Sequence, residues 1–204
     1  MDLAPFPESL LSVPPGRLYL LAERYRAELA AANPTAVRIT DKRPDNFLYI
    51  GLIKALFPDV KIIHTTRDPM DNCLSIFFLH LDQRMGYALD LMDTGHYFRQ
   101  YRRLMDHWKE MYPADIFDFH YDDFVRTPEA HGRRLYEFLG LSWDERYLAR
   151  PTRGQAVKTA SVWQVREPLH SRSSGRARHY SEHLVALREY LAGAPAYPEE
   201  GTDP

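Results

Sequence analysis

The hydrophobic pattern of residues 59–81 predicts a strand, a short turn and a helix in succession. An apolar, β-branched run over residues 60–66 is long enough for one strand. Asp68 can then serve as an N-cap and Pro69 as the first helical residue, where a missing N–H is not needed. The apolar residues that follow recur at helical spacing, and they are Cys73, Leu74, Phe77, Phe78 and Leu81.

Similar periodicities predict the remaining elements and an α/β fold. Strands that alternate with helices favour a parallel sheet covered by helices on both faces. With the strand over residues 60–66, further strands are predicted at residues 37–40 and 116–120. Three strands are few for such a sheet. Helices are predicted at residues 16–32, 45–57, 94–112, 127–140 and 180–191, and a short one after a capping box of Ser142 and Glu145.

Composition narrows the class of protein. A chain of 204 residues fits one domain. A net charge of −2 argues against a general nucleic-acid binder. One cysteine, Cys73, cannot form an internal disulfide, which favours a reducing compartment. With neither a leader pattern nor an apolar run long enough for a bilayer, we predict a cytoplasmic protein without a membrane partner.

Charged and aromatic residues follow each predicted strand. Lys42 follows the first strand, Arg67 the second and Tyr121 the third, and Ser75 lies about two helical turns beyond Arg67. In parallel sheets ligands bind at the carboxyl ends of the strands. A guanidinium and a hydroxyl are suited to holding a phosphate. Together with a basic segment over residues 149–178, these residues predict a site for an anion and a nucleobase.

Each of these residues also has a simpler explanation. Arg67 fits a surface ion pair, Ser75 a bond to its own helix, and Lys42 a solvated turn. Tyr121 fits core packing with a satisfied hydroxyl. The basic segment fits a solvated loop or a weak RNA contact. The pattern alone therefore does not name the ligand.

Several other kinds of site are excluded by missing motifs. No histidine pair stands at metal-ligand spacing beside carboxylates, and one cysteine cannot make a thiolate cluster, so no metal is expected. The nucleophile elbow of serine hydrolases and the glycine-rich phosphate loop of kinases are both absent from the sequence. Anion binding through side chains is the chemistry that remains.

Three stretches resemble one enzyme family. The stretch ITDKRPDNFLYIGLIKALFPDVKIIHTTRDPMDNCLSIFF is similar to the DKxPxNF segment and the 3′-phosphate motif of sulfotransferases that use 3′-phosphoadenosine 5′-phosphosulfate (PAPS). FHYDDFVRTP resembles their YEDL segment, and VKTASVWQVREPLHSRSSGRARHY their C-terminal stretch. The bacterial group often fused to tetratricopeptide repeats is the most similar. The resemblance runs from about Thr40 to Leu184.

The resemblance implies which residues bind PAPS and its product, adenosine 3′,5′-bisphosphate (PAP). Arg67 and Ser75 take the places that contact the 3′-phosphate, and Tyr121 takes the place of the tyrosine that lies against the adenine. Four positions of the C-terminal stretch complete the set, the first two beside the adenine and the last two at the 3′-phosphate: Thr159, Ser161, Gly175 and Arg176.

Lys42 stands where related cytosolic enzymes carry a catalytic histidine. By resemblance it lies near the sulfuryl group, where its ammonium would offset the charge that builds on the bridging oxygen. A protonated amine is a poor base, so the base stays unassigned. The implied enzyme is a PAPS-dependent sulfotransferase of P-loop-NTPase-like, three-layer α/β/α fold. It would act on a hydroxyl or amine of a small molecule, carbohydrate or peptide, without a metal.

The sequence departs from the family at its start. The family opens with a strand and a loop resembling FPRSGTT, which grips the 5′-phosphosulfate and has no counterpart here. We therefore expect an N-terminally truncated sulfotransferase domain over residues 1–192, without its first strand, and a disordered tail over 193–204. Smaller departures are Arg172 and Ala177, where a serine and an aromatic residue are expected.

This departure keeps two other readings open. One is a non-catalytic domain that binds PAP or serves in an interaction. The other is a different P-loop-like transferase such as a nucleotide kinase, which the missing loop disfavours equally. An exposed sheet edge would favour a homo-oligomer or association with the missing segment.

Overall fold

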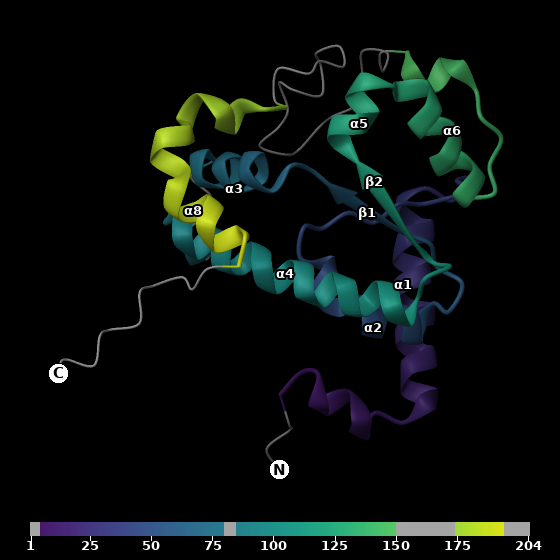
Figure 1. Cartoon of the computed structure of the whole chain (residues 1–204). Coiled ribbons are helices and arrows are strands. Elements are labelled where there is room, and N and C mark those ends of the chain that lie inside the picture. Colours follow the sequence, from purple (N-terminus) through teal and green to yellow (C-terminus); the bar gives the residue numbers. More distant parts are fainter. Residues whose placement is uncertain (1–4, 80–84, 150–173, 194–204) are drawn as a thin grey trace. The chain divides into compact units, whose positions relative to one another are not determined.

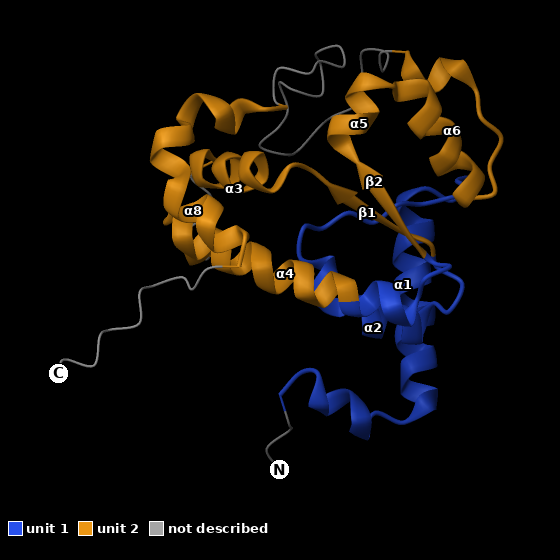
Figure 2. Ribbon diagram, in the orientation of Figure 1, with its two compact units in different colours: residues 1–60, 107–115 blue, residues 61–106, 116–204 orange. Residues whose placement is uncertain are grey.

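A computed structural model describes residues 5–79, 85–149 and 174–193 of the chain (Figure 1). Their helices and strands group into two units, which Figure 2 shows in separate colours. Unit 1 comprises residues 1–60 and 107–115, and unit 2 comprises residues 61–106 and 116–204. Across the described ranges, no helix is both long and apolar enough to cross a bilayer.

Unit 1 is helical in the part that the structure describes. Its longest helix begins at Pro15, whose ring suits a first helical turn, and ends before Asn33. The indole N–H of Trp108 donates to the carbonyl of Phe47 at 2.9 Å. The elements of this unit are η1 (Glu8–Ser12), α1 (Pro15–Ala32), η2 (Asn46–Tyr49), α2 (Ile50–Leu56) and the last residues of α4 (Leu91–Met111).

The strand predicted at residues 37–40 is wrong, because this segment has no regular structure. Val37 is 94% exposed. A short alternating segment becomes a strand only when it pairs with another one, since packing on neighbours is what β-propensity measures. The helix predicted over residues 45–57 is present as two consecutive pieces, η2 and α2.

Unit 2 is built on two parallel strands, β1 (Ile62–Thr66) and β2 (Ile116–His120), the only strands in the described part of the chain. Ile62 pairs with Ile116, and the register continues to Thr66 with His120. Figure 1 shows the two strands side by side. The other elements are α3 (Pro69–Phe78), η3 (Gly86–Ala88), the first part of α4, α5 (Tyr121–Arg126), α6 (Pro128–Phe138), η4 (Glu145–Leu148), η5 (Arg176–Leu184) and α8 (Val185–Leu191).

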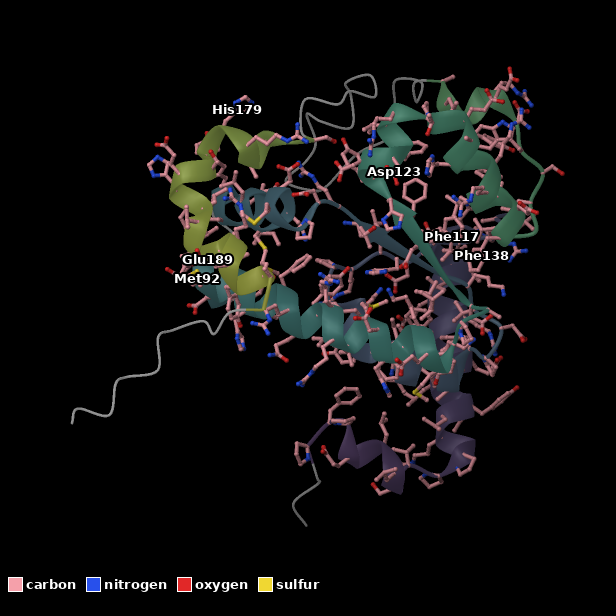
Figure 3. The ribbon with its side chains drawn as sticks, viewed as in Figure 1. Met92, Phe117, Asp123, Phe138, His179 and Glu189 are labelled. Carbon is pink, nitrogen blue, oxygen red and sulfur yellow. The ribbon has the colours of Figure 1, made fainter. Side chains whose placement is uncertain are left out.

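The two faces of the strand pair differ in polarity. On one face the Phe117 ring packs against Phe138 of α6, with centroids 5.2 Å apart (Figure 3). On the other face His64 of β1 lies between Asp118 of β2 and the hydroxyl of Tyr101 on α4, and both contacts are hydrogen bonds. Burial and the nearby Asp118 charge raise the pKa of Tyr101 to about 12, so its phenol stays neutral.

The core of unit 2 lies where α3, α4, η5 and α8 meet. Cys73 is fully buried there. Burial, and secondarily the Asp68 carboxylate, raise the pKa of its thiol to about 12, so this cysteine belongs to the core and not to the chemistry. The buried residues of this cluster are Cys73, Leu74, Phe98, Ala177, Leu184 and Leu187.

Most other predicted elements are found with shifted ends. The helix predicted over residues 180–191 is present as η5 and α8, which meet at residue 185. The predicted capping box of Ser142 and Glu145 is wrong. Asp144 caps η4 instead, by accepting a hydrogen bond from the Arg146 amide at 2.9 Å. The predicted disordered tail lies, from residue 194 onward, outside the described residues.

Gly132 on α6 makes a close contact that leads to our first prediction. The Trp143 ring lies directly on it, so a β-carbon at this position would overlap the ring. We expect Gly132→Val to lower the free energy of unfolding by about 1–3 kcal/mol through overpacking, as measured by urea denaturation. The matched control is Gly16→Val on α1, where a β-carbon would meet nothing within 4 Å. Equal stability of the two variants would contradict this packing.

Candidate functional site

The candidate site forms at the carboxyl edge of the strand pair, where each strand turns directly into a helix. Arg67 follows β1, and Asp68 then caps α3 by accepting a hydrogen bond from the Asp71 amide at 2.9 Å. Pro69 is the first residue of α3, so the predicted strand, turn and helix are confirmed. Tyr121 begins α5 immediately after β2.

Arg67 and Tyr121 meet because the two strands are parallel and in register. The guanidinium carbon of Arg67 lies 5.9 Å from the centre of the Tyr121 ring, within the range of a cation–π contact. The Arg67 side chain is only 18% exposed. A guanidinium held in this way can bind an anion while the neighbouring aromatic ring offers a surface for a flat ligand.

Asp71 ties Arg67 to a segment about a hundred residues further along the chain. Its carboxylate accepts hydrogen bonds from the backbone amides of Gly175 and Ala177, the latter at 2.7 Å. One oxygen of the same carboxylate lies 3.7 Å from a terminal nitrogen of Arg67. Asp71 is 1% exposed, so this ionic contact is shielded from water.

Asp122 makes a second connection between the same segments. Its carboxylate accepts a hydrogen bond from the backbone N–H of Asp68 at 2.8 Å and another from the hydroxyl of Ser174. The β1–α3 turn, the start of α5 and residues 174–177 are thereby linked through two carboxylates.

Ser75 and Arg176 lie on the same side of α3. Asp71, Ser75 and Phe78 are spaced by four and three residues, which places them along one stripe of the helix. Asp71 holds the residues on either side of Arg176, and the Arg176 guanidinium lies over the Phe78 ring, 5.0 Å from its centre. Ser75, between Asp71 and Phe78 on the stripe, is half-buried.

Gly175 has a backbone conformation that suits glycine. Its φ is +78°, in the left-handed region that residues with a β-carbon seldom adopt. It stands at the N-cap of η5, and this turn brings the amides of residues 175 and 177 toward the one carboxylate of Asp71. The glycine predicted at this position therefore shapes the loop that carries Arg176.

Four of the predicted site residues are linked in unit 2, directly or through Asp71 and Phe78 of α3: Arg67, Tyr121, Gly175 and Arg176. Ser75 lies on the same stripe of α3 as Asp71 and Phe78. Lys42 belongs to unit 1, where it lies exposed in the segment between α1 and η2. Beside it, Asp41 accepts a hydrogen bond from Tyr25, which raises the tyrosine pKa to about 12. Thr159 and Ser161 lie outside the described residues. Within the described ranges, no three His, Cys, Asp or Glu side chains gather as they would around a metal ion.

Sequence reasoning missed Asp71 and Asp122. Asp71 bonds to the amides of Gly175 and Ala177, which are 104 and 106 residues away in the sequence. The hydroxyl that bonds to Asp122 belongs to Ser174, which is 52 residues away. A signal was present for Asp71, which follows Arg67 by four residues and stands one helical turn before the apolar Leu74. A carboxylate on the buried face of an apolar helix needs partners, and the structure supplies them.

A family profile matches the larger part of the chain. The profile described as "Sulfotransferase family" matches residues 16–145, more than half of the 204-residue chain. An uncharacterized protein of Aquifex aeolicus is 34% identical over 189 residues, which cover 91% of this chain and 25% of that protein.

Named relatives come from mycobacteria. The omega-hydroxy-beta-dihydromenaquinone-9 sulfotransferase Stf3 of Mycobacterium tuberculosis and that of Mycobacterium bovis are each 32% identical over 117 residues, covering 53% of this chain and 30% of the relative. The chain thus spans between a quarter and a third of the length of the curated relatives that it matches.

Proposed function

The chain belongs to the sulfotransferase family, and we propose that it acts as a PAPS-dependent sulfotransferase. Such an enzyme moves a sulfuryl group from PAPS to a hydroxyl or amine acceptor. The observation that carries the proposal is the joining of Arg67, Tyr121 and the turn with Arg176 at one strand edge. Two guanidiniums and an aromatic ring match the charge and shape of a nucleotide that bears a 3′-phosphate.

In this proposal, different residues of the described chain contact the 3′-phosphate and the adenine of the nucleotide. Arg67, Ser75 and Arg176 hold the 3′-phosphate by charge-assisted hydrogen bonds, and the Gly175 turn presents Arg176 to it. Tyr121 lies against the adenine. The remaining adenine contacts are assigned by sequence to Thr159 and Ser161.

Lys42 is proposed as the catalytic residue near the sulfuryl group. Its ammonium would compensate the negative charge that develops on the oxygen of the leaving nucleotide while the sulfur bonds to the acceptor oxygen or nitrogen. No metal is required for this role, because the side-chain cations supply the positive charge.

Of the hydroxyl and amine acceptors we favour a hydroxyl, on a small molecule, a carbohydrate or a peptide. This choice is supported by Stf3, whose name describes a sulfotransferase for a hydroxylated dihydromenaquinone. We further propose that the complete fold is the three-layer α/β/α type of the P-loop NTPases and that the protein works in the cytoplasm.

The proposal is tested by comparing two nucleotides on the 204-residue chain. We expect titration calorimetry to give an affinity for PAP at least about tenfold higher than for adenosine 5′-monophosphate, which lacks the 3′-phosphate. Release of PAP from PAPS in the presence of hydroxyl and amine acceptors, followed by chromatography, then tests transfer. Equal affinity for the two nucleotides would overturn the assignment of the site.

A further inference from the structure

We infer that Asp71 is the positioning residue of the 3′-phosphate site: its buried carboxylate sets the place of Arg67 and of the Arg176 turn together. The inference rests on the proposed function and adds a residue that the family resemblance did not assign. It is drawn from the burial of Asp71 and from the three groups that its two oxygens face.

The Asp71 carboxylate is buried, which costs free energy unless its charge is compensated. A charged group taken out of water is tolerated only when it is paired and hydrogen-bonded. One oxygen of Asp71 accepts from the Ala177 amide at 2.7 Å. The other accepts from the Gly175 amide and faces Arg67 at 3.7 Å. Both oxygens are therefore engaged, and each partner belongs to the candidate site or flanks one of its residues.

The hydrogen bonds of Asp71 hold the backbone around Arg176 in place. The amides on both sides of Arg176 bond to the one carboxylate, so the backbone of Arg176 is fixed at two points. Its guanidinium then lies over Phe78 on the same stripe of α3 as Asp71 and Ser75. Since Arg67 faces Asp71 from the β1 side, one carboxylate orients the two cations that the proposed function assigns to the phosphate.

Asp71 and Asp122 hold different parts of the segment around Arg176. Asp122 also bridges the two segments, through the hydroxyl of Ser174 and the amide of Asp68. Asp122 thus fixes the chain entering the turn, whereas Asp71 fixes the turn itself. The positioning of the cations is accordingly assigned to Asp71.

The test uses Asp71→Asn, which preserves volume but replaces one acceptor oxygen with an NH₂ group that faces a backbone N–H. We expect the variant to lose about tenfold in PAP affinity while its affinity for adenosine 5′-monophosphate is unchanged. Only the contacts to the 3′-phosphate depend on the hydrogen bonds and the ionic contact of Asp71. A role limited to folding would lower both affinities alike. Asp144→Asn, at the exposed cap of η4, is the matched control and should keep the wild-type ratio.

A second measurement needs no variant. In the wild type, PAP should slow hydrogen exchange of the peptide that covers residues 174–184 more than adenosine 5′-monophosphate does. Only PAP carries the 3′-phosphate that contacts Arg176 in this segment. If the wild type does not prefer PAP, the proposed function itself is wrong. If the wild type prefers PAP, but Asp71→Asn keeps that preference or the two nucleotides protect residues 174–184 equally, the inference on Asp71 is overturned.

Discussion

Replacing Arg67 with alanine is expected to weaken PAP binding by about 1.5–3 kcal/mol, or roughly 10- to 150-fold, because a charge-assisted contact to the 3′-phosphate is lost. The side chain is largely buried between Tyr121 and Asp71, so water replaces it poorly. Titration calorimetry with PAP on the wild type and the variant measures the loss directly.

Two further variants sharpen this prediction. Arg67→Lys retains the charge but not the planar fork or its position over the Tyr121 ring, and should fall between the wild type and Arg67→Ala. Arg126→Ala removes an exposed arginine of α5 that pairs with Asp123, and should bind PAP as the wild type does. Equal PAP affinity in the wild type and Arg67→Ala would exclude Arg67 from the site.

The best-predicted part of the fold is the one whose signals are local. The strand before Arg67, the Asp68 cap and the Pro69 start are all fixed by neighbouring residues, and all are confirmed. The strand over residues 116–120 is also found with its predicted bounds. In these segments, propensity, capping and hydrophobic period point to the same structure.

Prediction failed where structure depends on a distant partner. Residues 37–40 alternate like a strand, yet no strand of the described chain pairs with them, and Val37 remains exposed. Near the C-terminal end of the described chain, the two pieces η5 and α8 replace one predicted helix, and the backbone at Tyr180 inside η5 is non-helical. Helical periodicity alone does not reveal such a kink, because the spacing of apolar residues barely changes across it.

The candidate site was predicted residue by residue, but not as a connected structure. Arg67, Tyr121 and Arg176 came from strand ends and from family resemblance, and the structure brings them into one unit. The links between them, Asp71 and Asp122, depend on hydrogen bonds between distant parts of the chain. Such bonds leave little trace in local spacing, which is why the supporting carboxylates were missed.

Replacing the buried Lys54 of α2 is expected to have a large effect on the free energy of unfolding. Its side chain is 6% exposed, and its ammonium bonds to the Asp115 carboxylate at 2.7 Å and to the Pro58 carbonyl. It also lies 5.5 Å from the centre of the Tyr112 ring. We expect Lys54→Ala to lower the free energy of unfolding by about 2–3 kcal/mol in urea denaturation, somewhat less than for a fully buried pair, since Asp115 is 27% exposed.

A double replacement separates the charge from the packing. Removing Lys54 alone leaves the Asp115 carboxylate partly desolvated without its ammonium, whereas Lys54→Met with Asp115→Leu removes both charges and retains apolar volume. Because well-packed apolar residues often replace buried ion pairs without loss, the double variant should recover most of the stability. Arg24→Ala, which breaks an exposed pair with Glu28 on α1, should change stability by less than about 0.5 kcal/mol. If Lys54→Ala were as mild as Arg24→Ala, the buried pair would contribute nothing to unit 1, and α2 would have to be held by its apolar contacts alone.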